Sequence, residues 1–442
     1  LLKPHEAYFE GDHCWNFRMG YAWYYLDQAG PALHYFERAL EARPGDEDTQ
    51  ELIDDCRERL ALPRFEQNFR RRTEDAWAAF AEVEAELRRA MDTGAIQERG
   101  GELLKTCGAA LALALCEPAF EIGFNGEKYE LILSPEGSRA GLFPLVYFQR
   151  RAPEAVLEHW NIHVGRQPSD KFELRSGPYE VRAGEVQVWV QRQEEGQVSL
   201  TLRCEKLLPL LKSDPDRAWW LLSTLTDQVL GEVSAIALIC GFQVTEAPMD
   251  GSPIPLSLLP ETIQSMGLPL WGDAGDYLEN CCLDYNLEPA EDPEADWRLD
   301  VYAGSTRLPA LIHDYMAAQS GTVDDYHRDG IAAGFLCLPL DGSDGGDGAQ
   351  QAAEIRDTLR AAILEKAGAG AVAFLGEASG LYCSYLDFIA WDLPAVLQAA
   401  AEIARDAGLA WVSFHSFRRD VATVRLFSRE EEGEPPIHEE TL

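Results

Sequence analysis

Two histidines are the first candidates for chemistry in this sequence. His159 and His163 lie four residues apart, a spacing that places two imidazoles on one face of a helix, as in some zinc sites. The stretch lacks the H-E-x-x-H order, and residues 161–164 have the composition of a strand, which would carry the two rings apart. No third ligand lies nearby in the sequence. We therefore predict no metal site here, and none elsewhere.

Two further clusters resemble ligand sites but fail on their spacing. Cys281 and Cys282 are adjacent, and neighbouring cysteines rarely bridge each other or share one tetrahedral metal ion. Asp341, Asp344 and Asp347 lie among glycines, but an EF-hand needs oxygens at alternating positions and a glutamate at position twelve. We predict ordinary surface or core thiols in the first case and a flexible acidic loop in the second.

The remaining candidates have structural explanations. Residues 324–329 combine acid, imidazole and guanidinium groups, and we predict a charged loop. His415 lies near Phe414 and Phe417, where we expect a hydrogen-bonded core or edge histidine. Residues 368–370 precede a strand, so they indicate a helix end and not a phosphate loop. Because no G-x-S-x-G, S-x-x-K or H-E-x-x-H motif occurs, we assign no catalytic residue and no cofactor.

The clearest pattern lies in residues 20–44. Two helices are needed to hold these residues in place. We predict these helices at 6–28 and 31–42, with a further helix at 48–62. Small and large residues recur at the spacing of one tetratricopeptide (TPR) repeat, so the segment resembles TPR-containing bacterial proteins. The residues that carry the resemblance are Gly20, Trp23, Ala32, Phe36, Ala39 and Pro44. Asn16 departs from the family pattern, which often has tryptophan there.

The resemblance implies a helical hairpin, stacked neighbours and a groove that binds a protein or peptide partner. The family layout places the groove positions on one face of the first helix, at Cys14, Phe17, Tyr21, Tyr24 and Tyr25. Phe17 and the three tyrosines could hold an extended peptide, because tyrosine combines apolar area with a hydroxyl and few rotatable bonds. The alternative is that these side chains pack against the following helices. We also expect further repeats upstream of Leu1.

The charge balance bears on the class of partner. The 442 residues include 75 Asp and Glu against 38 Lys and Arg, a formal net charge of −37. Phosphate backbones would be repelled, so we expect no nucleic-acid binding. The acidic residues form either an ordinary solvated surface or one that attracts a basic partner.

Apolar runs and cysteines bear on the cellular compartment. No apolar run reaches the roughly 18–20 residues that span a bilayer, so we expect no membrane association. The ten cysteines include no C-x-x-C pair, which favours reduced thiols over a disulfide framework. We therefore predict a cytoplasmic protein.

Hydrophobic periodicity and proline-rich boundaries divide the chain into six parts. They are a TPR-like repeat (1–62), a helical connector (63–117), a first α+β sandwich (118–250), a linker (251–295), a second α+β sandwich (296–428) and a disordered tail (429–442). The element orders β-α-β-β-β-α-β and, from residue 332, β-α-β-β-α-β favour two ferredoxin-like sandwiches. The first of these includes a buried strand at 235–244. The predicted fold class is multi-domain α plus α+β, with a TPR-like helical hairpin array before the sandwiches.

These observations favour a binding function over catalysis. The leading hypothesis is a non-catalytic interaction or scaffold protein whose TPR-like helices bind a partner. One alternative is an acidic inhibitor or immunity-like protein that neutralises a basic partner. Another is an enzyme with its site in a cleft between the two sandwiches, since catalytic groups need only meet in space. A deep pocket with several titratable groups would favour the enzyme, and an exposed aromatic groove would favour binding.

Overall fold

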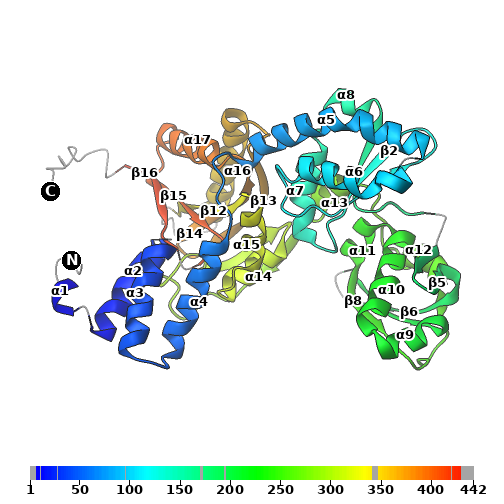
Figure 1. The fold of residues 1–442 in the computed structure, drawn as a ribbon. Helices are drawn as coiled ribbons and strands as arrows, with labels where there is room; N and C mark the ends of the chain where they lie inside the picture. The colour runs from blue at the N-terminus through cyan, green and yellow to red at the C-terminus, as the bar shows by residue number, and fades with distance from the viewer. Residues whose placement is uncertain are drawn as a thin grey trace. The chain divides into compact units, whose positions relative to one another are not determined.

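The computed structural model describes residues 6–9, 11–26, 28–94, 96–169, 173–193, 196–340, 347–419 and 421–429 (Figure 1). Helices and strands both recur along these residues, so the fold is mixed α plus β, as predicted. The chain forms two compact units, Leu1–Arg72 with Cys282–Leu442, and Thr73–Cys281. The first unit is therefore built from two segments that are far apart in the sequence.

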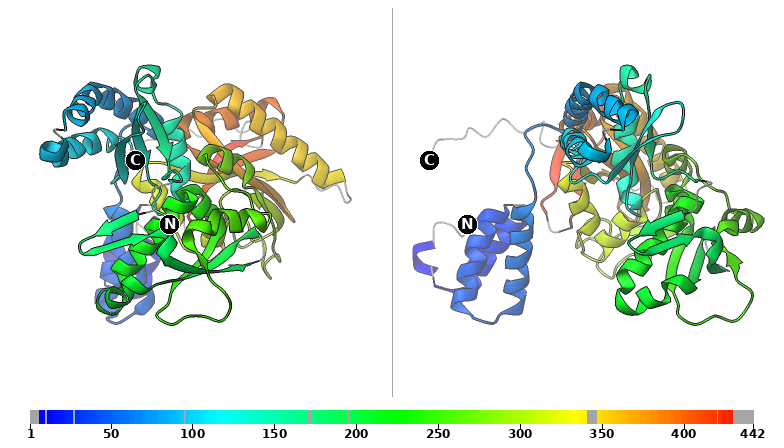
Figure 2. Two further views of the ribbon diagram at one scale, coloured as in Figure 1. Left: turned by 90° about the vertical axis from the view of Figure 1, so that its right-hand side faces the viewer. Right: turned by 45° about the vertical axis from the view of Figure 1, so that its right-hand side comes forward.

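Four helices begin the first unit: α1 (Glu6–Phe9), α2 (His13–Tyr25), α3 (Ala29–Ala42) and α4 (Glu47–Ala61). Asp12 caps α2, because its carboxylate accepts a hydrogen bond from the Trp15 backbone N–H at 2.7 Å. The helix predicted at 6–28 is thus divided into α1 and α2, whereas α3 and α4 agree closely with prediction. Helices α2, α3 and α4 pack side by side (Figure 2).

A seven-stranded sheet forms the rest of this unit. Its order is β10 (Leu283–Asn286), β11 (Val301–Thr306), β13 (Val372–Gly380), β14 (Cys383–Ala390), β12 (Ala332–Pro339), β15 (Trp411–Ser416) and β16 (Val424–Ser428). All neighbouring strands are antiparallel. The helices of this segment are α14 (Pro309–Met316), α15 (Gly321–Arg328), α16 (Asp347–Ala367) and α17 (Leu393–Asp406).

The alternation of side chains along the strands places two cores against this sheet. Leu336, Leu386 and Val412 belong to one buried cluster, together with Ile363 of α16 and Val396 of α17. The neighbouring positions Phe335, Tyr385 and His415 point to the other face, because successive residues of a strand alternate between faces. There Phe335 packs edge-on against Tyr315 of α14, with ring centroids 5.5 Å apart. The alternating burial along the strands therefore assigns each side chain to one face of the sheet or the other.

Two predictions for this unit differ from the structure. Residues 324–329, predicted as a charged loop, lie almost entirely in helix α15, because Val323 and Tyr326 are buried one helical turn apart. The strand expected at 297–302 begins at Val301 as β11, so residues 297–300 precede it. Of the predicted acidic loop, Asp347 begins helix α16, and residues 341–346 lie outside the described residues, as does the tail from residue 430.

A three-stranded sheet organises the first part of the other unit. Its order is β1 (Phe120–Phe124), β2 (Tyr129–Leu133) and β3 (Trp160–Val164), with β1–β2 antiparallel and β2–β3 parallel. The helices here are α5 (Phe69–Thr93), α6 (Ile96–Leu111), α7 (Arg139–Gln149) and α8 (Glu154–Leu157). The Trp77 ring of α5 stacks on Phe148 of α7 at 4.5 Å, and its indole N–H donates to the Phe148 carbonyl. The predicted helical connector is therefore part of this core.

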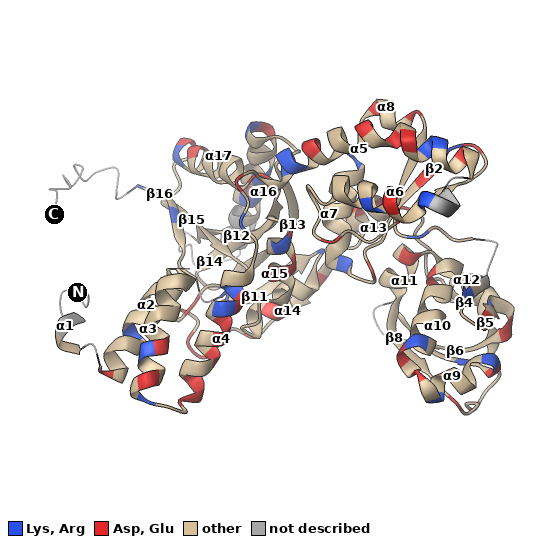
Figure 3. Ribbon diagram, viewed as in Figure 1, with Lys and Arg blue, Asp and Glu red and all other residues tan. Residues whose placement is uncertain are grey.

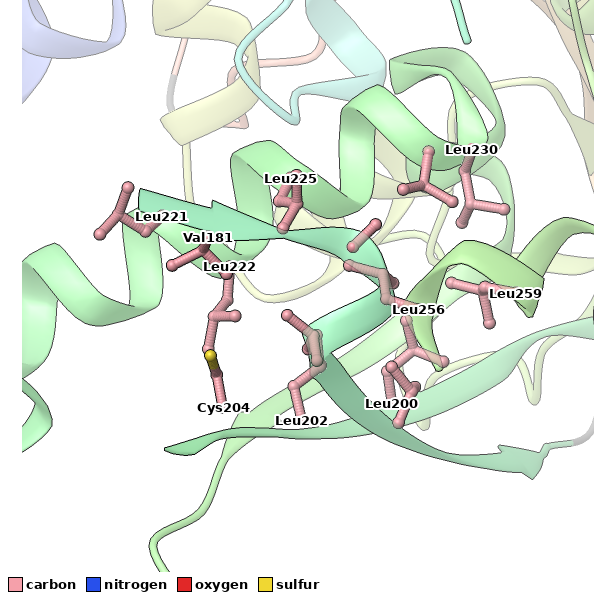
Figure 4. Packing of buried hydrophobic residues seen from close by; sticks show 14 of the residues in the cluster. Val181, Leu200, Leu202, Cys204, Leu221, Leu222, Leu225, Leu230, Leu256 and Leu259 are labelled. Carbon is pink, nitrogen blue, oxygen red and sulfur yellow. The ribbon is translucent and has the colours of Figure 1, made fainter. Parts of the chain in front are cut away.

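A four-stranded sheet organises the second part of this unit. Its order is β8 (Ile239–Val244), β7 (Val198–Cys204), β6 (Val186–Arg192) and β9 (Ile254–Pro255), and β4 (Glu173–Ser176) pairs with β5 (Tyr179–Arg182) beside it. The helices are α9 (Leu208–Ser213), α10 (Pro215–Leu230), α11 (Glu232–Leu238), α12 (Leu259–Ser265) and α13 (Ala274–Asn280). Leucines and valines from both layers interdigitate (Figure 4). Leu200, Leu225 and Leu259 are typical members of this cluster.

The first predicted sandwich is wrong in its sheet arrangement. Strands β2 and β3 belong to one sheet and β6 and β7 to another, so residues 118–250 do not form a single ferredoxin-like sheet. The strand predicted at 235–244 begins at Ile239, and residues 232–238 are helical. Residues 251–295 were predicted as a linker, but they supply Leu256, Leu259 and Ile263 to the buried cluster. The prolines of that segment interrupt its apolar periodicity, so the sequence pattern indicated a linker.

Among the described residues, no single helix has the length and hydropathy needed to cross a bilayer. The pair α10 and α11 meets that criterion only when the two are joined, and they are bent by 104°.

Gly231 makes the sharp bend between α10 and α11. Its φ is +81°, and a Cβ there would lie 3.0 Å from the Pro168 Cδ. We expect Gly231→Ala to lower the free energy of unfolding by about 1–3 kcal/mol, because an L-residue resists this conformation. Urea denaturation measures the loss. Gly101→Ala is the matched control, since Gly101 is helical with nothing within 4 Å of the added methyl, and it should be neutral or slightly stabilising. Equal urea midpoints of unfolding for Gly231→Ala and Gly101→Ala would contradict the prediction.

Candidate functional site

The hairpin of α2 and α3 depends on a close approach at Gly20. A Cβ at this position would lie 2.6 Å from Cδ1 of Phe36, so only glycine leaves room for the phenylalanine ring. Ala32, Phe36 and Ala39 are fully buried along α3. Trp23 is partly buried against the same core, and Pro44 lies in the turn after α3. The six residues that carried the sequence pattern therefore have structural roles.

An aromatic row runs along α2 and divides into buried and exposed members. The rings of Phe17 and Tyr21 stack with centroids 6.2 Å apart, and those of Tyr21 and Tyr24 are also 6.2 Å apart. Phe17 is half-buried and contacts Phe36 at 5.7 Å. Tyr21 and Tyr25 are 46% and 44% exposed. The row therefore presents Tyr21 and Tyr25 to solvent, with Phe17 at its edge.

Tyr24 was predicted to contact a partner, and the structure places it in the core. Its side chain is 4% exposed. Its hydroxyl accepts a hydrogen bond from the Arg59 guanidinium of α4 at 2.6 Å, and that guanidinium lies 4.0 Å from the ring centroid. The packing alternative is therefore correct for Tyr24, and partner binding by the other residues of this helix face stays a prediction. Tyr24 packs within the chain, whereas its neighbours Tyr21 and Tyr25 remain accessible. Cys14 is exposed on the same helix.

The helices around this row carry excess negative charge (Figure 3). Eleven acidic and five basic residues lie between positions 11 and 62. Several of the basic side chains already pair with acidic neighbours: Arg57 with Glu37 at 3.0 Å and Arg59 with Asp55 at 2.6 Å. The surplus carboxylates therefore have no matching positive charge within this helical segment. A partner with positive charge would complement the segment.

The other sequence candidates do not converge. His163 lies on β3, 3.5 Å from a Glu130 carboxylate oxygen, and His159 is exposed just before that strand. No cluster of three or more His, Cys, Asp or Glu suited to a metal ion occurs in the described part of the chain. Cys281 is buried and Cys282 is exposed. His415 is buried, and its ring nitrogens lie 2.6 and 3.0 Å from backbone carbonyl oxygens, so it is a packed core histidine.

A buried charged network in the seven-stranded sheet escaped sequence analysis. Arg298 donates to both carboxylate oxygens of Asp387 at 2.5 and 3.3 Å, and to the Tyr285 hydroxyl at 2.9 Å. Asp300 accepts a hydrogen bond from the Tyr385 hydroxyl at 2.6 Å. Burial raises the pKa of the Asp387 carboxyl, and the Arg298 guanidinium opposes that rise. Asp387 lies within an apolar strand, and this position was a signal for a buried charged group. The sequence did not indicate its partner, because Arg298 lies 89 residues away.

The mutual satisfaction of these groups indicates a structural role. Arg298 and Asp387 each have a 1% exposed side chain. Each charged group has an opposite charge or hydroxyl at hydrogen-bond distance, so its hydrogen-bonding groups are satisfied without a ligand.

Comparison with known proteins adds no relative: no protein-family model, no curated protein and no solved structure matches this chain.

Proposed function

We propose that α2, α3 and α4 form a TPR-like unit that binds an extended, basic peptide segment of a protein partner, and that the chain acts as a non-catalytic interaction or scaffold protein. The observation that carries the proposal is the pair Tyr21 and Tyr25, each close to half exposed on a helix whose opposite face is tightly packed. Exposed aromatic rings held by rigid neighbours are typical of binding hot spots.

The choice of a basic partner follows from charge. The eleven acidic side chains between residues 11 and 62 would favour lysine- or arginine-bearing segments and speed their association. The alternative of an acidic inhibitor or immunity-like protein has the same partner chemistry. It differs in its outcome, because an inhibitor would abolish the activity of the bound partner. The enzyme alternative stays a prediction.

We further infer that residues 332–416 form a ferredoxin-like sandwich. Along the chain the order is β12-α16-β13-β14-α17-β15, and in the sheet it is β13-β14-β12-β15 with antiparallel neighbours. Residues of α16 and α17 pack in one cluster against this sheet, which supports the assignment. The fold hosts many unrelated functions, so it carries no activity by itself.

Peptide binding should be lost when the two exposed tyrosines are removed. We expect Tyr21→Ala/Tyr25→Ala to weaken binding of an extended lysine- and arginine-rich peptide about 30- to 900-fold, because each aromatic anchor contributes of order 1–2 kcal/mol. Fluorescence anisotropy against a peptide set graded in net charge measures the change. Affinity for the unaltered chain should also fall as salt increases.

The control for this test is another exposed aromatic residue. Tyr302→Ala removes a ring that is 39% exposed on β11, and it should leave binding unchanged. Equal affinities for the double variant and the unaltered chain, with both folded by circular dichroism, would exclude α2 as the binding surface. Preference for acidic over basic peptides would exclude the proposed partner class.

A further inference from the structure

An open pocket of about 430 Å³ lies within the unit Thr73–Cys281. Its walls come from α10, from α11 and β8, and from the turns that follow β2 and β3. None of the site residues predicted from the sequence lines it. The side chains that define its chemistry are Glu136, Arg166, Trp219, Trp220, Asp227 and Glu232.

Asp227 differs from Glu232, which is hydrogen-bonded, and from Glu136, which is exposed. Its carboxylate makes no hydrogen bond and no close ion pair with any residue in the described part of the chain. Burial raises its pKa to about 7, the negative charge of Glu232 adds to the rise, and the positive charge of Arg166 opposes it. A desolvated carboxylate without a partner is costly, and a bound cation would relieve that cost.

Arg166 cannot supply the missing counter-charge, because two other carboxylates already hold it. Its Nε lies 2.6 Å from Glu121 Oε1, and its Nη1 lies 3.6 Å from Glu232 Oε2. Glu232 is buried and also accepts hydrogen bonds from the Ser134 hydroxyl at 2.7 Å and the Arg166 backbone N–H at 3.0 Å. Arg166 and its two partners carry a net negative charge, and Asp227 adds to it.

Two tryptophans complete the pocket on α10. Trp219 and Trp220 are 48% and 51% exposed, an unusual exposure for two adjacent large rings. Trp219 packs edge-on against Phe242 of β8 with centroids 5.5 Å apart, which fixes its orientation. The face of an indole ring attracts cations, and it also covers alkyl chains.

We propose that this pocket binds an organic cation, an alkylammonium group whose charge lies against Asp227 and whose alkyl chain lies against Trp219 and Trp220. An anion would meet the surplus carboxylates, and a small hydrated metal ion would gain little from the indole faces. The ammonium belongs either to a free amine or to a lysine side chain. The proposal is independent of peptide binding by α2, because the two surfaces lie in different units.

The affinity should increase with pH. The titratable groups that line the pocket with Asp227 are Glu136 and Glu232, and Arg166 faces them. A cation requires the charged form of Asp227, which increases as pH rises through about 7. The charged fraction then grows about tenfold between pH 6 and pH 8, so the association constant should grow by about the same factor.

Isothermal titration calorimetry of the full chain tests this, with butylammonium, 1,4-diaminobutane and Nα-acetyl-lysine amide as probes at pH 6 and pH 8. We expect Asp227→Asn to weaken binding at least tenfold at pH 8 and to remove the pH dependence. Trp220→Ala should weaken binding several-fold. Asp216→Asn is the matched control, since Asp216 lies in the exposed first turn of the same helix and lines no part of the pocket.

The probes separate the two sources of the ammonium group. Tighter binding of the free amines supports a small-molecule ligand, and tighter binding of the lysine derivative supports a protein side chain. The proposal is overturned if no probe binds at millimolar concentration, or if Asp227→Asn binds as well as the unaltered chain. Asn matches the shape of the protonated aspartate, so the fold should survive, and Trp220→Ala provides a second test if it does not.

Discussion

Replacing Asp387 by alanine is expected to lower the stability of the unit that contains the seven-stranded sheet by about 3–5 kcal/mol, because the change leaves a buried guanidinium without its counter-charge. Arg298 is held by both carboxylate oxygens of Asp387, and both side chains are 1% exposed. Because the Arg298 side chain is almost completely buried, water cannot solvate the guanidinium that remains, and its charge is left uncompensated. Urea denaturation followed by tryptophan fluorescence measures the loss, and Trp297 and Trp391 lie in this unit.

Two comparisons isolate the cause of this loss. Arg298→Met/Asp387→Leu should recover most of the stability, because a buried ion pair contributes little more than apolar residues of similar volume. Asp325→Ala should change stability by about 1 kcal/mol or less, since its pair with Arg328 at 3.1 Å is exposed on both sides. A loss below about 1 kcal/mol for Asp387→Ala would show that the network is not the charged core described above.

The second large effect is expected at Phe36. Phe36→Ala should destabilise the α2–α4 helices by about 3–5 kcal/mol, because it empties a site at the centre of their core. Phe36 is fully buried, with Phe17 and Tyr24 at 5.7 and 6.1 Å between ring centroids. Hydrogen exchange read by mass spectrometry over residues 13–61 measures the loss of protection.

His34→Ala is the matched control for Phe36→Ala. His34 lies on the exposed side of α3, two residues from Phe36, so its loss should change protection by no more than about 0.5 kcal/mol. If Phe36→Ala leaves exchange in α2 and α4 unchanged, the three helices do not share one core. The comparison also matters for function, because the exposed tyrosines of α2 depend on this core for their orientation.

These variants separate stability from binding in the same helices. Phe36 should control folding of the hairpin, whereas Tyr21 and Tyr25 should control partner affinity with little effect on folding. Burial is the physical basis for this division. A large ring at 0% exposure contributes through packing, and one near half exposure contributes mainly when a partner covers it.

The local elements of the chain were predictable where periodicity was strong. Helices α3 and α4 agree closely with the helices predicted at 31–42 and 48–62, and strand β3 agrees with the strand composition of residues 161–164. The predictions failed where an apolar run fits either structure. Residues 235–238 continue a helix before strand β8 begins, and a short apolar run cannot distinguish a buried helix from a strand. Helix α15 was missed because charged residues concealed its two buried positions.

The sequence by itself determined the small-residue hairpin, the period-two strands and the acidic character of the chain. These properties depend on residue type and short spacing, which the chain carries locally. Only the tertiary structure decided that Tyr24 is core while Tyr21 is exposed, and that Arg298 pairs with Asp387. It also decided that strands β2 and β6 belong to different sheets, and that Asp227 shares a pocket with Glu136 and Arg166. Each of these depends on contacts between distant segments, whose packing no local pattern encodes.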